Sequence, residues 1–196
     1  MIVPFLLPEA RWFVFLVRAD GPRPKETATL EAMQRAHIGN FQRRYAEGKL
    51  VTAGPVDDPT KHRRGIVVLG VGTLKEVHAC FEGDPYIEGR IMRVEAHRWA
   101  TPPKGFSIVP DPAKMAEYRI ARIALPAGYH GPFPTLPGGV GGKFAGENLG
   151  VILVSSTDEA AIRRTLDASE AVKKGGSYDV IPLYLSAGAL GSTSTP

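Results

Sequence analysis

The order of strand and helix patterns along the first hundred residues limits the folds open to this chain more than any other feature. Residues 12–17 (WFVFLV) form an apolar run with no polar residue, which is typical of a strand in the middle of a sheet. Further patterns follow in chain order: a helix at 27–47, strands at 50–56 and 65–71, a helix at 73–81, a short turn of helix from 84, and a strand at 94–100. This order is that of a split βαβ unit, which usually folds as a four-stranded antiparallel sheet with two helices on one face.

Local signals mark where the two longer helices begin and end. The first helix carries its larger side chains three or four positions apart, at Leu30, Met33, His37, Phe41 and Tyr45. Thr27 or Thr29 is expected to cap the start of this helix, and Gly48 to end it. Thr73 and Glu76 have the spacing of a capping box at the start of the second helix.

The second half of the chain repeats part of this pattern. The segment GVILV at residues 150–154 matches GIVVL at residues 65–69, and a helix starting at Ser156 or Thr157 follows it. Two further strand patterns lie at 118–125 and 178–185. These features indicate a degenerate internal repeat, although two generic strand–helix–strand stretches also resemble each other by chance.

The repeat predicts an α+β protein made of two ferredoxin-like split βαβ units, with residues 1–103 as one domain and residues 104–196 as the other. The tandem copies would pair through their open sheet faces and form a pseudo-dimeric α+β barrel. In the second copy, residues 126–146 hold seven glycines and four prolines, which excludes a regular helix. We expect this segment to be a loop, either a lid or an inert excursion, and residues 186–196 to form a loose tail.

Composition excludes several classes of protein. The chain has 24 Lys and Arg against 20 Asp and Glu, without a concentrated basic face, so nucleic acid is not expected as a main partner. Cys80 is the only cysteine, which allows no internal disulfide and no cysteine-rich zinc site. No apolar run approaches the roughly 20 residues that span a bilayer, and residues 1–8 lack the basic leader of a signal peptide. The expected location is the cytoplasm, with no membrane partner.

Three short motifs in the first half carry a resemblance to a known family. They are Ala36-His37 in the first helix, GKLVTAGP at residues 48–55, and Gly83-Asp84-Pro85-Tyr86 after the second helix. With these motifs in this order, residues 11–100 resemble the YCII-related proteins, small ferredoxin-like domains that pair as dimeric α+β barrels. The resemblance implies that His37 and Asp84 form the catalytic pair.

The second half keeps only the pattern of the fold. Ser169 stands 85 positions after Asp84, and the segment that would hold a helical histidine is the stretch at 126–146. The two copies therefore predict one equipped site and one vestigial site. Whether the usual homodimer of the family also forms is left open.

Each candidate residue also has a structural interpretation. His37 lies on the apolar stripe of its helix, so it is either a core histidine or a general acid–base group. Asp84 before Pro85 is a common helix start, and its carboxylate would also orient His37. Gly54, Pro55 and Tyr86 are the candidate substrate-binding residues, although Gly54 and Pro55 also suit a close backbone approach at the end of a strand.

Other polar residues give weaker signals. The run at 62–64 (HRR) is either an anion-binding turn or a solvated one, and the role of His97 stays undecided on a strand face that it shares with Trp99. Cys80 is expected to be a buried, unreactive thiol. The histidines are too scattered for a metal site, and the glycine-rich run at 138–143 lacks the ending of a phosphate-binding loop. We expect no metal and no organic cofactor.

Two main functions are consistent with these features. In the first, a small cyclic or enolic substrate binds in the barrel interior, His37 acts as base and then as acid, and Asp84 orients it. Elimination, isomerisation and hydrolysis all need only this pair, and the family resemblance favours elimination. The alternative is a non-catalytic ligand-binding or accessory protein that uses the same cavity. A third possibility is an interaction protein that pairs through its sheet edges.

Overall fold

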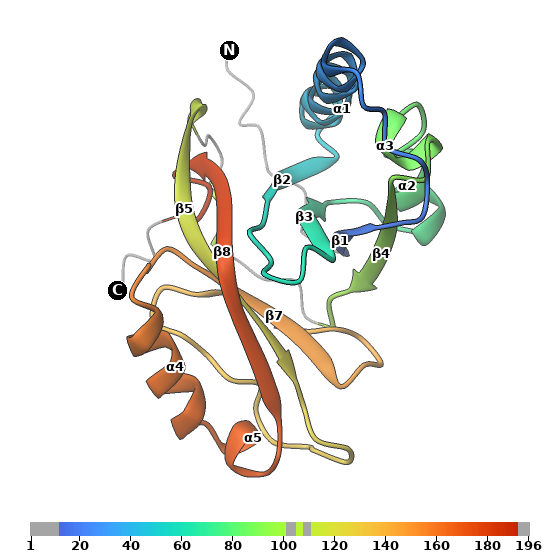
Figure 1. The fold of residues 1–196 in the computed structure, drawn as a ribbon. Helices are drawn as coiled ribbons and strands as arrows, with labels where there is room; N and C mark the ends of the chain where they lie inside the picture. The colour runs from blue at the N-terminus through green and yellow to red at the C-terminus, as the bar shows by residue number, and fades with distance from the viewer. Residues whose placement is uncertain (1–11, 101–104, 108–110, 192–196) are drawn as a thin grey trace, which may run out of the picture.

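The chain folds into two four-stranded antiparallel sheets with helices on their outer faces (Figure 1). The structure is a computed structural model that describes residues 12–100, 105–107 and 111–191. Helices α1 to α3 lie on one side of the molecule and α4 and α5 on the other, with both sheets between them. This arrangement confirms the predicted α+β fold with two similar ferredoxin-like halves.

The first half contains the elements in the predicted order. They are β1 (Trp12–Arg18), α1 (Thr27–Ala46), β2 (Leu50–Pro55), β3 (Arg63–Leu69), α2 (Leu74–Ala79), α3 (Pro85–Glu88) and β4 (Met92–Arg98). The sheet order is β2-β3-β1-β4, so β1 lies inside the sheet, as its uninterrupted apolar run predicts. Both of its neighbours, β3 and β4, run antiparallel to it.

The second half has the same topology with fewer helices. Its elements are β5 (Asp111–Ala124), β6 (Val140–Lys143), β7 (Leu149–Val154), α4 (Glu159–Ala168), α5 (Glu170–Lys173) and β8 (Ser177–Ala187), and the sheet order is β6-β7-β5-β8. The segment at 126–146 contains no helix, but the prediction of a loop throughout is wrong. Val140–Lys143 pairs with β7 as a short strand, because glycine allows the close approach: a Cβ on Gly141 would lie 2.0 Å from the Val151 carbonyl oxygen.

Both faces of β1 are buried, because successive side chains of a strand point to opposite sides. Phe13, Phe15 and Val17 pack into a core shared by the two sheets. Trp12, Val14 and Leu16 pack against the side of the sheet that the helices cover, where Val77 of α2 and Phe41 of α1 lie. A separate core lies between the second sheet and its helices. The molecule therefore has four layers, and the inner pair of layers forms the interior of the barrel.

Backbone contacts between the edge strands close this barrel. At one junction the N–H of Asp57, after β2, donates to the Pro182 carbonyl of β8 at 3.0 Å. At the other junction the N–H of Ala145, after β6, donates to the Arg98 carbonyl of β4 at 2.6 Å, and Trp99 pairs with Phe144. The edge strands of the two sheets thus hydrogen-bond to each other within one chain. This arrangement is the pseudo-dimeric barrel that the sequence predicts.

The signals for the helix ends are partly confirmed. Thr73 and Glu76 form the predicted capping box, and Gly48 follows α1 with φ +70°. The predicted cap of α1 is wrong: Glu26 holds the N-cap position without a side-chain bond to the helix backbone. The cap of α4 is Asp158, not Ser156 or Thr157, because its carboxylate reaches the Ala161 N–H at 2.9 Å.

The prediction of a loose tail at 186–196 is wrong for residues 186–190. Strand β8 continues to Ala187, and Leu190 pairs with Phe106 and is buried in the core between the sheets. Apolar contact with the barrel therefore holds this end of the chain. Residues 192–196, most of the predicted linker after 100, and the first eleven residues lie outside the described part. Among the residues that the structure describes, no helix is long and apolar enough to cross a bilayer.

Candidate active site

Helices α1 and α3 bring together the two residues that the sequence singled out as a catalytic pair. His37 lies in the middle of α1 and Asp84 at the N-cap of α3, 47 positions later. The His37 Nδ1 and Asp84 Oδ2 atoms are 2.6 Å apart. Asp84 is fully buried and His37 is 9% exposed. A hydrogen bond of this length in a buried site fixes the orientation of the imidazole ring.

Both carboxylate oxygens of Asp84 are used. Oδ2 lies against His37, and Oδ1 accepts the Tyr86 backbone N–H at 3.0 Å, which caps α3. Because an ionised carboxylate only accepts hydrogen bonds, His37 Nδ1 is the donor when Asp84 is ionised. In the neutral imidazole this leaves Nε2 with its lone pair available. The capping and the orienting interpretations of Asp84 are thus compatible, because each uses a different oxygen.

Aromatic rings enclose the imidazole. The ring centroids of His37 and Phe41 are 4.5 Å apart, and those of His37 and Tyr86 are 5.2 Å apart, both in edge-on arrangements. The Tyr86 hydroxyl donates to Gln34 Oε1 of α1 at 3.1 Å. Tyr86 therefore belongs to the same cluster as the pair, on the side where α1 and α3 meet.

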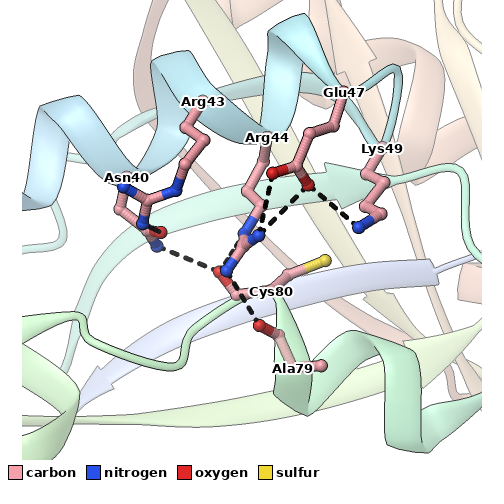
Figure 2. A network of polar contacts seen from close by, with 7 residues as sticks. All are labelled: Asn40, Arg43, Arg44, Glu47, Lys49, Ala79 and Cys80. Carbon is pink, nitrogen blue, oxygen red and sulfur yellow. Dashed lines mark hydrogen bonds and ion pairs between the residues drawn. The ribbon is translucent and has the colours of Figure 1, made fainter.

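A polar network fixes α1 against the end of α2 (Figure 2). Asn40 Nδ2 and Arg44 Nε both donate to the Cys80 carbonyl, at 3.0 and 3.1 Å, and a second Arg44 nitrogen donates to the Ala79 carbonyl at 3.0 Å. These carbonyls end α2 and have no partners within that helix. The network fixes α1 over about the first two turns after His37. Burial raises the pKa of the Cys80 thiol, so the sulfur is a poor nucleophile in the folded protein.

The location of the pair differs from the sequence-based expectation. His37 contacts Phe41 and Tyr86 on the side of the first sheet that the helices cover, whereas the barrel interior lies on its other face. Apolar side chains from both sheets fill most of that interior, among them Phe13, Ile66 and Leu183. The pair therefore does not face the barrel interior in which the sequence predicts that the substrate binds, because α1 packs on the outer face of its sheet.

Gly54 and Pro55 lie at the junction of β2 and β8, and the structure does not bring them into contact with the His37–Asp84 pair. A Cβ on Gly54 would lie 1.8 Å from the Tyr184 carbonyl oxygen. This contact favours the architectural interpretation, in which glycine permits a close backbone approach. Of the three candidate substrate-binding residues, only Tyr86 lies beside the pair.

A polar cleft of about 290 Å³ lies between the two halves, away from the pair. Its wall includes Asp58 and Arg63 of the first half and Asp179 of the second. Arg63 donates to Asp58 Oδ2 at 3.0 Å and to Asp179 Oδ1 at 2.7 Å, so the run at 62–64 is more than a solvated turn. Burial opposes the ionisation of Asp58, but hydrogen bonds from Arg63 and Thr60 outweigh it and hold the pKa of Asp58 well below its usual range.

The same cleft is lined by His97, which belongs to a second histidine–carboxylate pair that the sequence did not predict. His97 Nδ1 lies 2.9 Å from each carboxylate oxygen of Glu147, 50 positions away in the other half. His97 shares the inner face of β4 with Glu95, since they lie opposite Phe13 and Phe15 of β1. The strand-like alternation of residues 94–100 was the sequence signal that His97 shares one face of its strand with Glu95. No sequence motif marks its partner Glu147.

The second half lacks a counterpart of the first pair. Ser169 caps α5 as Asp84 caps α3, with its hydroxyl 3.4 Å from the Val172 N–H. No helix connects β5 to β6, so no residue corresponds to His37. Across the described residues, no group of three His, Cys, Asp or Glu side chains is placed to hold a metal ion.

The fold and the site together define a class: an α+β barrel made of two ferredoxin-like halves, of which one carries a buried histidine–carboxylate pair between its helices. Residues 14–100 match the family model of the YCII-related domain. The match covers the part of the chain in which the three motifs lie, and it confirms the resemblance that they indicate. No curated protein matches the chain.

Several solved structures match the chain. Among them is a protein from Lactobacillus acidophilus that is provisionally assigned as a monooxygenase. The TM-score is 0.51, with 93% of this chain and 96% of the other covered at 11% sequence identity. At this identity the similarity supports the fold of both halves, and not a shared reaction.

Proposed function

We propose that the protein is a small-molecule enzyme in which His37 acts as a general acid–base group and Asp84 positions it. The observation that carries the proposal is the 2.6 Å contact between His37 Nδ1 and a fully buried carboxylate. A carboxylate placed in this way holds the imidazole in one tautomer and stabilises the imidazolium that forms when Nε2 takes a proton. The match of residues 14–100 to the YCII-related domain adds support.

The reaction follows from this arrangement. His37 Nε2 takes a proton from a carbon or hydroxyl of the substrate, and the positive charge is shared with Asp84 across their hydrogen bond. The same nitrogen then returns the proton to the leaving group or to another atom of the substrate, so the enzyme ends in its starting state. Elimination, isomerisation and hydrolysis by activated water all fit this cycle, and the family resemblance favours elimination.

Tyr86 is the substrate-binding residue that the geometry supports best. Its ring lies edge-on to His37, and its hydroxyl is fixed by Gln34, so a substrate bound at the imidazole would lie close to this ring. A flat, small substrate suits contact with an aromatic ring. The proposal includes a cytoplasmic location, which the single free thiol suggests. It leaves open whether two chains associate as a homodimer.

A screen for ligands followed by turnover assays tests the proposal. Small phenols, enolic acids, lactones and halogenated ring compounds are added to the wild type and to His37→Gln, and unfolding temperatures are compared. We expect a stabilising compound that acts on the wild type alone and is converted by it. His78→Gln, which changes an exposed histidine on α2, is the matched control and should behave like the wild type. Equal turnover by wild type and His37→Gln would contradict the proposal.

A non-catalytic role for the pair is the second candidate, because one observation favours it. The His37 side chain is only 11% exposed, and its bond to Asp84 ties α1 to α3 as a structural contact would. In this case the protein binds a small molecule without changing it. Mass analysis of a bound compound after long incubation separates the two functions, since only the enzyme alters the mass or the isomer of its ligand.

A further inference from the structure

The barrel interior changes from apolar to polar at one end. Inner positions of the strands carry apolar side chains near the middle of the barrel and charged ones at this end. Glu95 of β4 lies opposite Phe15, and Arg122 of β5 lies opposite Asp179 of β8. Together with Phe15 and Leu149, these side chains line the cleft of about 290 Å³. Its volume is just below the usual range of small-molecule pockets, which is about 300 to 1,000 Å³.

The acidic groups of the cleft already have donors. Asp58 accepts from Thr60 and from Arg63, and Asp179 accepts from Arg63 at 2.7 Å. Glu95 accepts from Arg93 beside it on the strand. These carboxylates leave the cleft little capacity to bind a cation, because their charges are paired within the protein.

Arg122, unlike these carboxylates, has unused hydrogen-bonding groups. Its nearest carboxylate oxygen is Asp179 Oδ2 at 3.9 Å, and its guanidinium makes no hydrogen bond to any residue in the described ranges. The side chain is 39% exposed and lines the cleft. A guanidinium has five N–H donors in a planar fork that fits a carboxylate. Arg122 therefore gives the cleft free donors that can pair with an anion.

His97 offers a second fixed group on the same cleft. The Glu147 carboxylate accepts from Nδ1 at 2.9 Å, and the imidazole stacks on Phe144 with centroids 4.5 Å apart and planes 12° apart. The ring is thus held in place from two sides. Its Nε2 has no hydrogen-bond partner among the residues that the structure describes, and in the neutral ring this atom accepts from a hydroxyl.

We propose that this cleft is a second ligand site, separate from the His37–Asp84 pair, that takes a small hydroxylated aromatic carboxylate. The ligand's carboxylate pairs with Arg122, its ring lies against Phe15 and Leu149, and its hydroxyl donates to His97 Nε2. The site uses residues of both halves, so it exists only in the assembled barrel. It requires no chemistry at His37 and stands whether or not the proposed reaction occurs there.

The test uses 4-hydroxybenzoate as the probe and 4-hydroxybenzamide as its uncharged counterpart. Each compound is titrated into the full, isotope-labelled chain, and amide shifts are followed by NMR. The proposal predicts shifts centred on residues 15, 97, 122 and 149. It also predicts binding of the amide about tenfold weaker than that of the acid, because the amide lacks the charge that Arg122 recognises. Equal binding of both compounds, or no shift at millimolar acid, would overturn the proposal.

Variants locate the site independently. Arg122→Gln should weaken binding of 4-hydroxybenzoate about tenfold, whereas Arg164→Gln, at an exposed position of α4, should leave it unchanged. His37→Gln should also leave it unchanged, which separates this site from the proposed catalytic one. Unaltered affinity in Arg122→Gln, or probe-induced shifts centred on His37 and Tyr86, would contradict the assignment. The comparison of acid with amide in the wild type keeps the test valid if a variant fails to fold.

Discussion

Asp84 and Ser169 each cap a short helix at corresponding places in the two halves, but only Asp84 also binds a histidine. A cap needs one acceptor atom, and serine and aspartate provide it about equally well. The two positions differ in the second carboxylate oxygen of Asp84, which contacts His37. A substitution at Asp84 can therefore remove the contact with His37 and still cap α3.

Asp84→Ser is therefore the first informative variant. The serine hydroxyl keeps the cap of α3, but His37 Nδ1 loses its acceptor in a buried place, which costs about 1–3 kcal/mol of unfolding free energy. Under the proposed function, turnover falls about 10²- to 10⁴-fold. NMR of the imidazole nitrogens should show the Nδ1–H tautomer in the wild type and a mixture in the variant.

The matched control for this variant is Asp158→Ser. Asp158 caps α4 through the Ala161 N–H at 2.9 Å, and no histidine is bound to it. Its replacement should change the unfolding free energy by a few tenths of a kcal/mol at most. Similar losses in Asp84→Ser and Asp158→Ser would show that the second oxygen of Asp84 contributes nothing.

The ion pairs of Arg63 predict unequal effects of removing this arginine and of removing its exposed partner Asp179. Asp58 is 2% exposed and accepts from both the side chain and the backbone N–H of Arg63, and only the side-chain bond is lost in Arg63→Met. The Asp179 side chain, by contrast, is 38% exposed. Arg63→Met leaves the Asp58 carboxylate buried without its cation and should cost about 3–5 kcal/mol. Asp179→Asn should cost about 1 kcal/mol or less. Denaturant unfolding measures both, and equal losses would contradict this explanation.

The same carboxylate predicts how stability depends on pH. The pKa of Asp58 is lowered in the folded protein, so its contribution to stability is complete above its unfolded pKa of about 3.9 and is lost as the pH falls toward the folded value. The unfolding free energy should therefore decrease between about pH 5 and pH 3, and less steeply in Asp58→Asn. Asp57→Asn, which changes an exposed neighbour, should keep most of the wild-type slope. An unchanged slope in Asp58→Asn would contradict the prediction.

Local pattern was sufficient to predict most of the fold. The apolar run of β1 indicated a strand in the middle of a sheet, and the capping box at Thr73 indicated the start of α2, because both signals depend on neighbours in sequence. Strand β6 was missed because its glycines do not have strand propensity and are required only by the approach of β7. The other three strands of the second half were predicted, since they have ordinary strand patterns.

The two candidate sites also differ in how far the sequence could predict them. His37 and Asp84 were found because a family motif carries them, but their side of the sheet was not, since nothing in a helical stripe tells which face of a sheet it will cover. The cleft could not be predicted, because Arg63 and Asp179 are 116 positions apart and meet only when the two halves pack. Pairs such as His97 and Glu147 have no local signature, and they become visible only in three dimensions.

Gly54 provides a last test of how the halves join. A Cβ at this position would lie 1.8 Å from the Tyr184 carbonyl oxygen, so Gly54→Ala must push β2 away from β8. We expect a loss of about 1–3 kcal/mol in unfolding free energy and weaker protection of the Asp57 amide, which donates across the same junction. Gly39→Ala is the control, since a Cβ there meets nothing within 4 Å on α1. It should raise stability by about 0.5–1 kcal/mol, because alanine loses less conformational entropy in a helix. If Gly54→Ala were as stable as the wild type in thermal unfolding, the close contact of β2 with β8 would not be part of what holds the two halves together.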